Sequence, residues 1–236
     1  MRNLLQTLFL LATTTLFAQL PESIIEPSKE VDLFDNYKGS IYKLKKHKEA
    51  SITDEASGTF NGELNYNIYL DIIEYVKNDN LFQIVKSPSV YANIKGDYYY
   101  YCNFKNSRGQ KRQGYYVLVE LSDNYSVYKK YTLKITPPDE LDVDPMTGGI
   151  PPGSIKTLTS YYLEENGVIL ELPVGKKDLL ATLSDKKNEL EKYISSEKIN
   201  PKKEEDLLRL VSRYNALKNS DTNPTRSLLS NTDQNN

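Results

Sequence analysis

Apolar and polar residues alternate along much of the first two thirds of the chain, which is typical of strands with one buried face. The longest example runs from Leu64 to Val76 and predicts a single half-buried antiparallel strand. Shorter strands are predicted at Gly39–Leu44 and Leu81–Val85. The apolar face of the long stretch carries Leu64, Tyr66, Ile68, Leu70, Ile72 and Val76.

A series of neighbouring strands is predicted further along the chain. Asp97–Lys105 and Gly114–Leu121 flank the turn sequence Asn106–Gly109, in which Gly109 tolerates a positive φ. The strand Tyr125–Thr136 follows after a second turn. Strands that each neighbour the next in sequence favour an antiparallel sheet that curls into a barrel or a sandwich.

Residues 137–156 break the alternation because they are rich in proline and glycine, which disfavour regular structure. They predict either a linker between domains or a long loop. A hairpin is predicted next, with strands Ser160–Glu164 and Val168–Leu172. Asn166 and Gly167 lie between them and form the strongest short hairpin signal.

From Gly175 the apolar period changes from two to about 3.6, which predicts helices. The expected helices are Lys176–Leu183, Asp185–Glu197 and a third that begins at Asn200-Pro201, an N-cap followed by a proline at the first helical position. The predicted fold class is α+β. It consists of an antiparallel β-sheet meander, barrel- or sandwich-like, followed by a β-hairpin and a small C-terminal helical subdomain.

The first 18 residues predict export, since Arg2 precedes an uncharged, largely apolar run that ends at Ala18. An uncleaved anchor is the alternative, although the run is shorter than the about 20 apolar residues of a membrane span. The chain is expected to be periplasmic or extracellular, free or associated with the outer membrane. The expected segments are a signal peptide (1–18), a flexible leader (19–30), a β-rich domain (31–136), a linker (137–156), a hairpin with three helices (157–218) and a disordered tail (219–236).

Charge and composition exclude several kinds of site. The net charge of −2 argues against a nucleic-acid partner. One cysteine and one histidine exclude a disulfide within the chain and a cysteine–histidine zinc site. The histidine, His47, lies in a basic run and is expected in a solvated loop or on an edge strand. We therefore predict no catalytic residues, no metal site, no cofactor and no transmembrane segment in the mature chain.

Carboxylates leave one enzymatic alternative open. Asp142 and Asp144 begin like a calcium-binding loop, but the later ligand positions are not filled. Asp71 and Glu74 fall on opposite faces of the predicted long strand, so they are not expected to form a glycosidase pair. A hydrolase would need carboxylates that are distant in sequence.

Tyrosine is the most distinctive residue type, with 19 in the chain and four in succession from Tyr98 to Tyr101. Alternation sends Tyr99 and Tyr101 to one face of the strand. With Tyr116 and Tyr128 from neighbouring strands, they predict a solvent-facing aromatic strip that binds a glycan or a partner protein. The alternative is that these tyrosines only stabilise the sheet through cross-strand pairs.

Several segments resemble exported proteins of Bacteroidota, a group of secreted flavobacterial proteins of unknown function. The resemblance is carried by Phe17-Ala18-Gln19, by the strand sequence Glu63–Glu74 and by Gly167–Leu217, which includes Glu171–Asp178 and Tyr193-Ile194. It implies an exported protein of this architecture and brings no catalytic residues with it.

These observations predict an exported, non-enzymatic binding or accessory protein of the bacterial envelope, with an envelope protein or a glycan as its partner. Two alternatives remain, a carboxylate-dependent hydrolase and a structural component of an outer-membrane assembly. The oligomeric state does not follow from the sequence.

Overall fold

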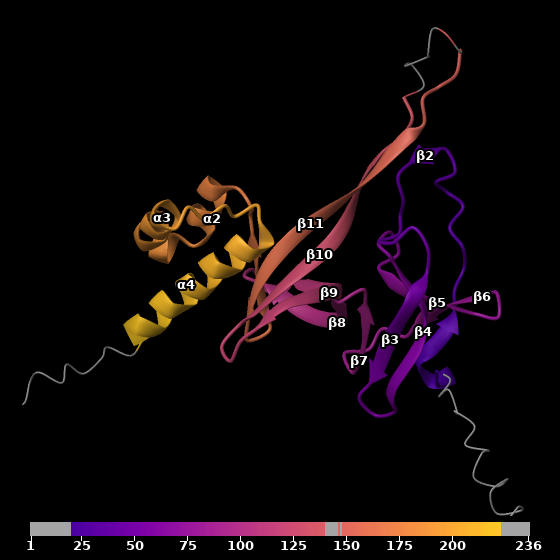
Figure 1. Ribbon diagram of the computed structural model, residues 1–236, viewed down its shortest axis with the longest axis horizontal. Helices are drawn as coiled ribbons and strands as arrows, with labels where there is room; N and C mark the ends of the chain where they lie inside the picture. Colours follow the sequence, from indigo (N-terminus) through magenta and orange to yellow (C-terminus); the bar gives the residue numbers. More distant parts are fainter. Residues whose placement is uncertain (1–19, 140–145, 147, 223–236) are drawn as a thin grey trace, which may run out of the picture. The chain divides into compact units, whose positions relative to one another are not determined.

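The computed structural model describes residues 20–139, 146 and 148–222 (Figure 1). The predicted signal peptide, Asp142, Asp144 and the tail beyond Thr222 lie outside the described residues. The chain forms two compact units: unit 1 extends to Tyr101 and includes Ile135–Lys156, and unit 2 contains Cys102–Lys134 and continues from Thr157. No helix in the described part of the chain combines the length and the apolar character needed to cross a membrane.

Unit 1 is built on an antiparallel sheet. Its strands lie in the order β1-β6-β5-β4-β3-β7-β8, and the short strand β2 (Tyr37–Lys38) pairs in parallel with the start of β11. The sheet strands are β1 (Ile25–Pro27), β3 (Lys48–Asp54), β4 (Gly58–Asn67), β5 (Ile72–Lys77), β6 (Asn80–Ile84), β7 (Val90–Ile94) and β8 (Asp97–Asn106).

The stretch 64–76 is not one strand, and our prediction of a single strand there is wrong. It forms the hairpin of β4 and β5, in which Asn67 pairs with Ile72. Local hydrogen bonds close the turn: the Leu70 amide donates to Asn67 Oδ1 at 3.1 Å, and the Tyr66 hydroxyl donates to Asp71 Oδ1 at 2.6 Å. Asp71 takes a φ of 53°, a conformation that aspartate tolerates better than most residues.

The start of the described chain is ordered where we expected a flexible leader. Residues Glu22–Ile24 form a 3₁₀ turn, and β1 pairs with the edge of β6. Leu20 and Ile24 are 3% and 5% exposed, so their side chains contribute to the core of unit 1. Burial of this apolar surface favours an ordered segment.

Two-residue turns connect several hairpins. Asn78-Asp79, Lys95-Gly96 and Asn166-Gly167 each have positive φ at both positions, the geometry that suits the twist of paired strands. The predicted hairpin around Asn166-Gly167 is confirmed, with Glu165 opposite Val168. Gly109 also has positive φ, at 74°, in the turn after β8.

Unit 2 contains a closed ring of strands. The order is β8-β12-β11-β10-β9, and β9 pairs with β8 to close the ring. The closure depends on a short parallel pairing in which Val168 lies opposite Lys105. The additional strands are β9 (Lys111–Leu121), β10 (Ser126–Thr136), β11 (Gly153–Glu165) and β12 (Val168–Leu172).

Three α-helices pack against one side of this ring, shown in orange and yellow in Figure 1: α2 (Lys176–Thr182), α3 (Lys187–Ser196) and α4 (Glu204–Thr222). The third begins at Glu204, later than predicted, because Asn200 caps a turn instead: its Oδ1 accepts from the Lys202 amide at 3.2 Å. Val127, Leu163 and Leu172 from the ring share one apolar core with the helices. The predicted α+β class, an antiparallel sheet with a small helical end, is confirmed.

The two units divide the chain differently from the predicted domains. Residues 102–134 were expected in the first domain but belong to unit 2, where their strands complete the ring. The segment 135–156, expected largely as a linker, belongs to unit 1. The boundaries follow strand pairing, which the proline and glycine content does not reveal.

Candidate functional site

An aromatic cluster lies on the ring of unit 2 and contains two of the four tyrosines predicted to bind. The rings of Tyr116 and Tyr128 are 6.2 Å apart, and Phe104 lies 5.1 and 5.2 Å from them. Tyr162 from β11 adds a T-shaped contact to Tyr116 at 5.7 Å. Edge-to-face contacts at these distances stabilise aromatic pairs.

The other two predicted tyrosines are assigned to the other unit. Tyr99 and Tyr101 belong to unit 1, and Tyr99 is 1% exposed with its ring 5.1 Å from that of Tyr66. The expected solvent-facing strip of four is therefore wrong: Tyr99 is in the core, and Tyr116 is 3% exposed. Tyr101 and Tyr128 are half-buried.

Alternation along β8 is correct, but the assignment of its faces is reversed at Tyr98 and Tyr99. Tyr98 is 43% exposed, whereas Tyr99 points inward. The register explains this choice because Tyr99 lies opposite Ala92 of β7, whose small side chain leaves room for a buried ring. Which face is buried depends on the neighbouring strand, and the sequence of β8 alone does not contain that information.

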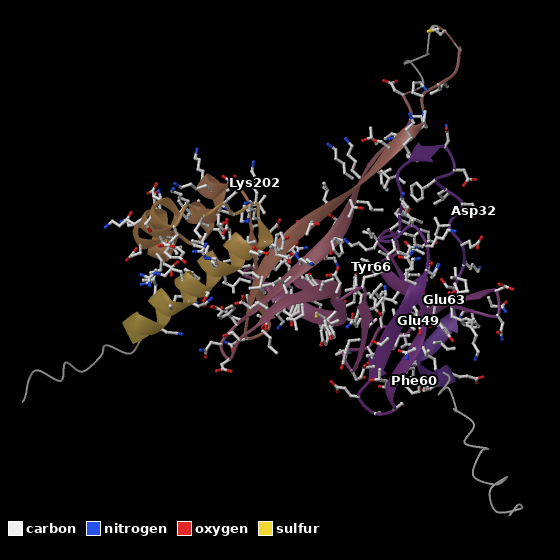
Figure 2. All side chains as sticks on the ribbon, in the orientation of Figure 1. Asp32, Glu49, Phe60, Glu63, Tyr66 and Lys202 are labelled. Atoms are coloured by element: carbon white, nitrogen blue, oxygen red, sulfur yellow. The ribbon has the colours of Figure 1, made fainter. Side chains whose placement is uncertain are left out.

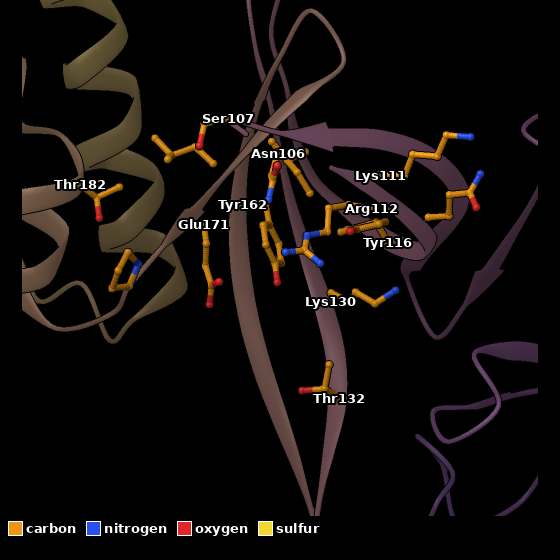
Figure 3. Close-up of a pocket in the computed structure, with 14 residues that line it drawn as sticks. Asn106, Ser107, Lys111, Arg112, Tyr116, Lys130, Thr132, Tyr162, Glu171 and Thr182 are labelled. Carbon is orange, nitrogen blue, oxygen red and sulfur yellow. The ribbon is translucent and has the colours of Figure 1, made fainter. Parts of the chain in front are cut away.

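A pocket of about 630 Å³ opens beside the aromatic cluster, and we call it the barrel pocket (Figure 3). Strands β9, β10, β11 and β12 supply its walls, so residues far apart in sequence converge on it. Figure 3 shows the side chains of Tyr162, Arg112 and Tyr116 pointing toward one another within it. The residues that carry its charge and aromatic character are Lys111, Arg112, Tyr116, Lys130, Tyr162 and Glu171.

The barrel pocket has more positive than negative side chains. Lys130 Nζ lies 4.6 Å from the centre of the Tyr116 ring, a cation–π contact. Burial raises the pKa of Tyr162, the Glu171 carboxylate acts in the same direction, and Arg112 acts in the opposite direction. Tyr162 therefore remains a neutral hydroxyl that can donate or accept hydrogen bonds at neutral pH.

The residues predicted from the sequence did not include Arg112, Lys130, Tyr162 and Glu171 of the barrel pocket. One signal was available, because counting outward from the Asn166-Gly167 turn places Tyr162 directly opposite Glu171, as the register shows. The proximity of Arg112 and Lys130 to that pair depends on the closure of the ring, for which the sequence has no local signal.

Unit 1 contains a second polar centre, and it corrects our expectation for His47. Its Nε2 lies 3.5 Å from Glu74 Oε2, and the side chains are 24% and 0% exposed, so His47 is not a solvated loop residue. The premise that Asp71 and Glu74 share one strand is also wrong, since Asp71 lies in the turn before β5. Only the folded chain brings His47, which precedes β3, to a carboxylate of β5.

Reactive and metal-binding groups are limited in the described residues. Burial raises the pKa of the Cys102 thiol to about 12, so the reactive thiolate is scarce at neutral pH. Within residues 20–139, 146 and 148–222, no three histidine, cysteine, aspartate or glutamate side chains lie close enough together to hold a metal ion.

Comparisons with protein-family models, with curated proteins and with solved structures find no match to this chain.

Proposed function

We propose that this chain is an exported, non-enzymatic binding protein of the bacterial envelope and that the barrel pocket binds an acidic glycan. The observation that carries the proposal is the convergence in one pocket of Arg112 and Lys130 with the half-buried ring of Tyr162, which packs against the buried ring of Tyr116. Cations and aromatic rings are the two kinds of group that recognise a charged sugar, through its carboxylate and its apolar ring face respectively.

The rest of the wall supports a glycan over a purely ionic ligand. Asn106, Gln113, Thr132 and Thr182 line the same pocket and offer neutral hydrogen-bonding groups. These groups suit the hydroxyls of a sugar, whereas Arg112 suits a carboxylate because its guanidinium donates two parallel hydrogen bonds. Glu171 selects against ligands whose negative charge extends toward β12.

Binding is tested by titration calorimetry with a uronic-acid oligosaccharide and, as the neutral comparison, a glucose oligosaccharide of equal length. We expect binding of the acidic oligomer alone, with an affinity that falls as salt is added because exposed charges are screened. Arg112→Gln should weaken binding about tenfold, which corresponds to about 1.4 kcal/mol.

Arg108→Gln is the matched control for this experiment. Arg108 is exposed in the turn after β8 and does not line the barrel pocket, so its substitution should leave the affinity unchanged. Equal losses in both variants, or equal binding of the acidic and neutral oligomers, would contradict the proposal.

Export is tested separately by cell fractionation and by sequencing the N-terminus of the recovered protein. Cleavage after Ala18 would leave Gln19 as the first residue. A cytoplasmic protein that retains Met1 would overturn the compartment while leaving the binding proposal to its own test.

The two alternatives have less support. For the hydrolase, Asp32, Glu74 and Asp79 line one pocket of unit 1, but Glu74 is 0% exposed. For a structural component that adds strands at its edge, the edge strand β1 is three residues long and ends in Pro27. A short edge with proline opposes strand addition.

A further inference from the structure

One face of the unit 1 sheet buries three polar side chains beside the apolar Ile72. Asn65, Asn67 and Glu74 are 2%, 0% and 0% exposed, and the register places Asn65 directly opposite Glu74. Burial of a carboxylate away from water costs several kcal/mol unless partners compensate for the lost hydration. If stability were the only requirement, an apolar side chain at position 74 would avoid this cost.

The partners of Glu74 satisfy only part of its carboxylate. Oε1 accepts a hydrogen bond from Asn67 Nδ2 at 2.8 Å and a longer one from the Tyr42 hydroxyl at 3.5 Å. Oε2 accepts no hydrogen bond from the described residues, and His47 Nε2 lies 3.5 Å from it. A buried carboxylate with an unsatisfied oxygen calls for an explanation, and a ligand-binding site is one such explanation.

Glu74 forms part of the wall of a pocket of about 470 Å³, which we call the acidic pocket. Its rim carries the exposed carboxylates of Glu30, Asp32 and Asp79, of which Asp32 is labelled in Figure 2. None of the described residues that line it is a lysine or an arginine, and the lysines that flank His47 lie outside the lining. Opposite in sign to the barrel pocket, it attracts positive charge.

The behaviour of Tyr42, on the floor of this pocket, agrees with a negative local potential. Its pKa is raised to about 12, first because it is buried and then because the negative charges of Glu74 and Glu30 oppose its ionisation. The same charges that disfavour a phenolate favour a bound cation.

The shape of the pocket distinguishes between kinds of cation. Its carboxylates are spread around the rim, and no three of the described ligand-type side chains converge as a metal ion requires. Val76 and Leu81 provide an apolar wall of partly exposed side chains. This combination suits a charged head group on an aliphatic stem, because the stem can cover apolar surface while the head meets carboxylates.

We propose that the acidic pocket of unit 1 binds an alkylammonium ion. Asp32 and Asp79 contact the ammonium group at the rim, the stem lies along Val76 and Leu81, and the buried charge of Glu74 makes the floor negative. A free diamine and the side chain of a lysine share this chemistry. The site has no residue in common with the barrel pocket, so it does not depend on the function proposed above.

The test is titration calorimetry with 1,5-diaminopentane and, separately, with a lysine blocked at both its amino and carboxyl ends. Pentan-1-ol is the neutral comparison and magnesium chloride the metal comparison. We expect both amines to bind, pentan-1-ol not to bind and magnesium not to displace them. Glu74→Gln should weaken binding about tenfold because it removes the buried charge while keeping the shape of the side chain.

Glu63→Gln is the matched control, since Glu63 is an exposed residue of the same sheet that does not line the pocket (Figure 2). A second variant, Asp32→Asn with Asp79→Asn, changes only exposed side chains and keeps the proposal testable if Glu74→Gln unfolds. Amine binding that is lost in this double variant and kept in Glu63→Gln supports the proposal.

Three results would overturn it: no heat from either amine at millimolar concentration, equal affinity for pentan-1-ol, or unchanged binding in both the rim variant and Glu74→Gln. If only one amine binds and the rim variant abolishes that binding, the proposal stands. In that case the result identifies the source of the ammonium group as a free amine or a polypeptide.

Discussion

The two units use buried polar groups in opposite ways. In unit 2 the core between ring and helices is a cluster of apolar side chains, with Leu190, Leu207 and Leu210 all 0% exposed, although the helical segment also buries Lys186 and Asn215. In unit 1 one sheet face buries Asn65, Asn67 and Glu74 beneath the segment that carries Tyr42 and His47. Apolar burial stabilises wherever the volume is filled, whereas polar burial stabilises only if each group finds its partner.

The pockets of the two units also differ in the sign of their charge. The barrel pocket of unit 2 has Lys111, Arg112 and Lys130 against Glu171, while the acidic pocket of unit 1 has several carboxylates and His47. The chain as a whole has a net charge of only −2, so composition conceals two local fields of opposite sign. Local arrangement, and not the overall balance of charge, determines which ligands each unit attracts.

The largest expected loss of stability comes from a substitution in the apolar core of unit 2. Leu190→Ala should lower the free energy of unfolding by about 2–5 kcal/mol, since it removes buried methyl groups and leaves a cavity. Urea denaturation measures the loss. Leu121→Ala, at a side chain 73% exposed, should change stability by less than about 0.5 kcal/mol, and similar losses for the two would contradict the assigned core.

The second largest loss of stability is expected from a substitution on the buried polar face of unit 1. Asn67→Ala should cost about 1–3 kcal/mol, because Glu74 Oε1 loses its donor at 2.8 Å and stays buried. The same denaturation experiment applies. Asn188→Ala, an exposed position in α3, provides the control and should be nearly neutral. A neutral Asn67→Ala would show that the buried carboxylate does not depend on this hydrogen bond.

A smaller effect is expected in the aromatic cluster of unit 2. Tyr128→Leu keeps an apolar side chain but removes the ring contacts to Phe104 and Tyr116, which should cost about 1 kcal/mol. Thermal unfolding followed by circular dichroism detects this loss. Tyr98→Leu changes a ring that is 43% exposed and 6.5 Å from Tyr91, and a cost as large as that of Tyr128→Leu would contradict the prediction.

The smallest effect is a pH dependence in unit 1. Folding raises the pKa of Tyr42 from its ordinary 10.0 to about 12, so the folded state keeps a proton that the unfolded state releases. Its contribution to stability is complete below pH 10 and is lost as the pH rises to about 12. Denaturation midpoints between pH 9 and 12 should therefore fall less steeply for Tyr42→Phe than for the natural protein. The matched Tyr98→Phe exchange should follow the natural slope.

Local signals predicted the elements whose geometry is set by a few adjacent residues. The Asn166-Gly167 hairpin forms as expected because both residues adopt positive φ easily. The change of period at Gly175 correctly marks the helical end, where α2 begins at Lys176. In each case the signal and the structure involve the same short stretch of chain.

Predictions failed where the local structure depends on a segment that is distant in the sequence. The apolar alternation from Leu64 to Val76 runs through the turn without a break in the sequence, but Leu64 pairs with Tyr75, so Ile72 and Val76 lie on the opposite face from Leu64. Hydrogen bonds at Asn67 and Asp71 close the hairpin. His47 looked solvated in its basic run, and its contact with Glu74 depends on pairing between Ile41 and Ile68. Of the predicted binding residues, Tyr116 lies at the barrel pocket and Tyr99 in a core.

The sequence by itself determined the fold class, the hairpin turn around Asn166-Gly167 and the position of the helical end, because propensity and periodicity act over a few residues. Tertiary structure alone decided which face of β8 is buried, which strands close the ring and which charges converge in each pocket. Those outcomes depend on register between segments far apart in the chain, and a shift of one residue exchanges the two faces of a strand.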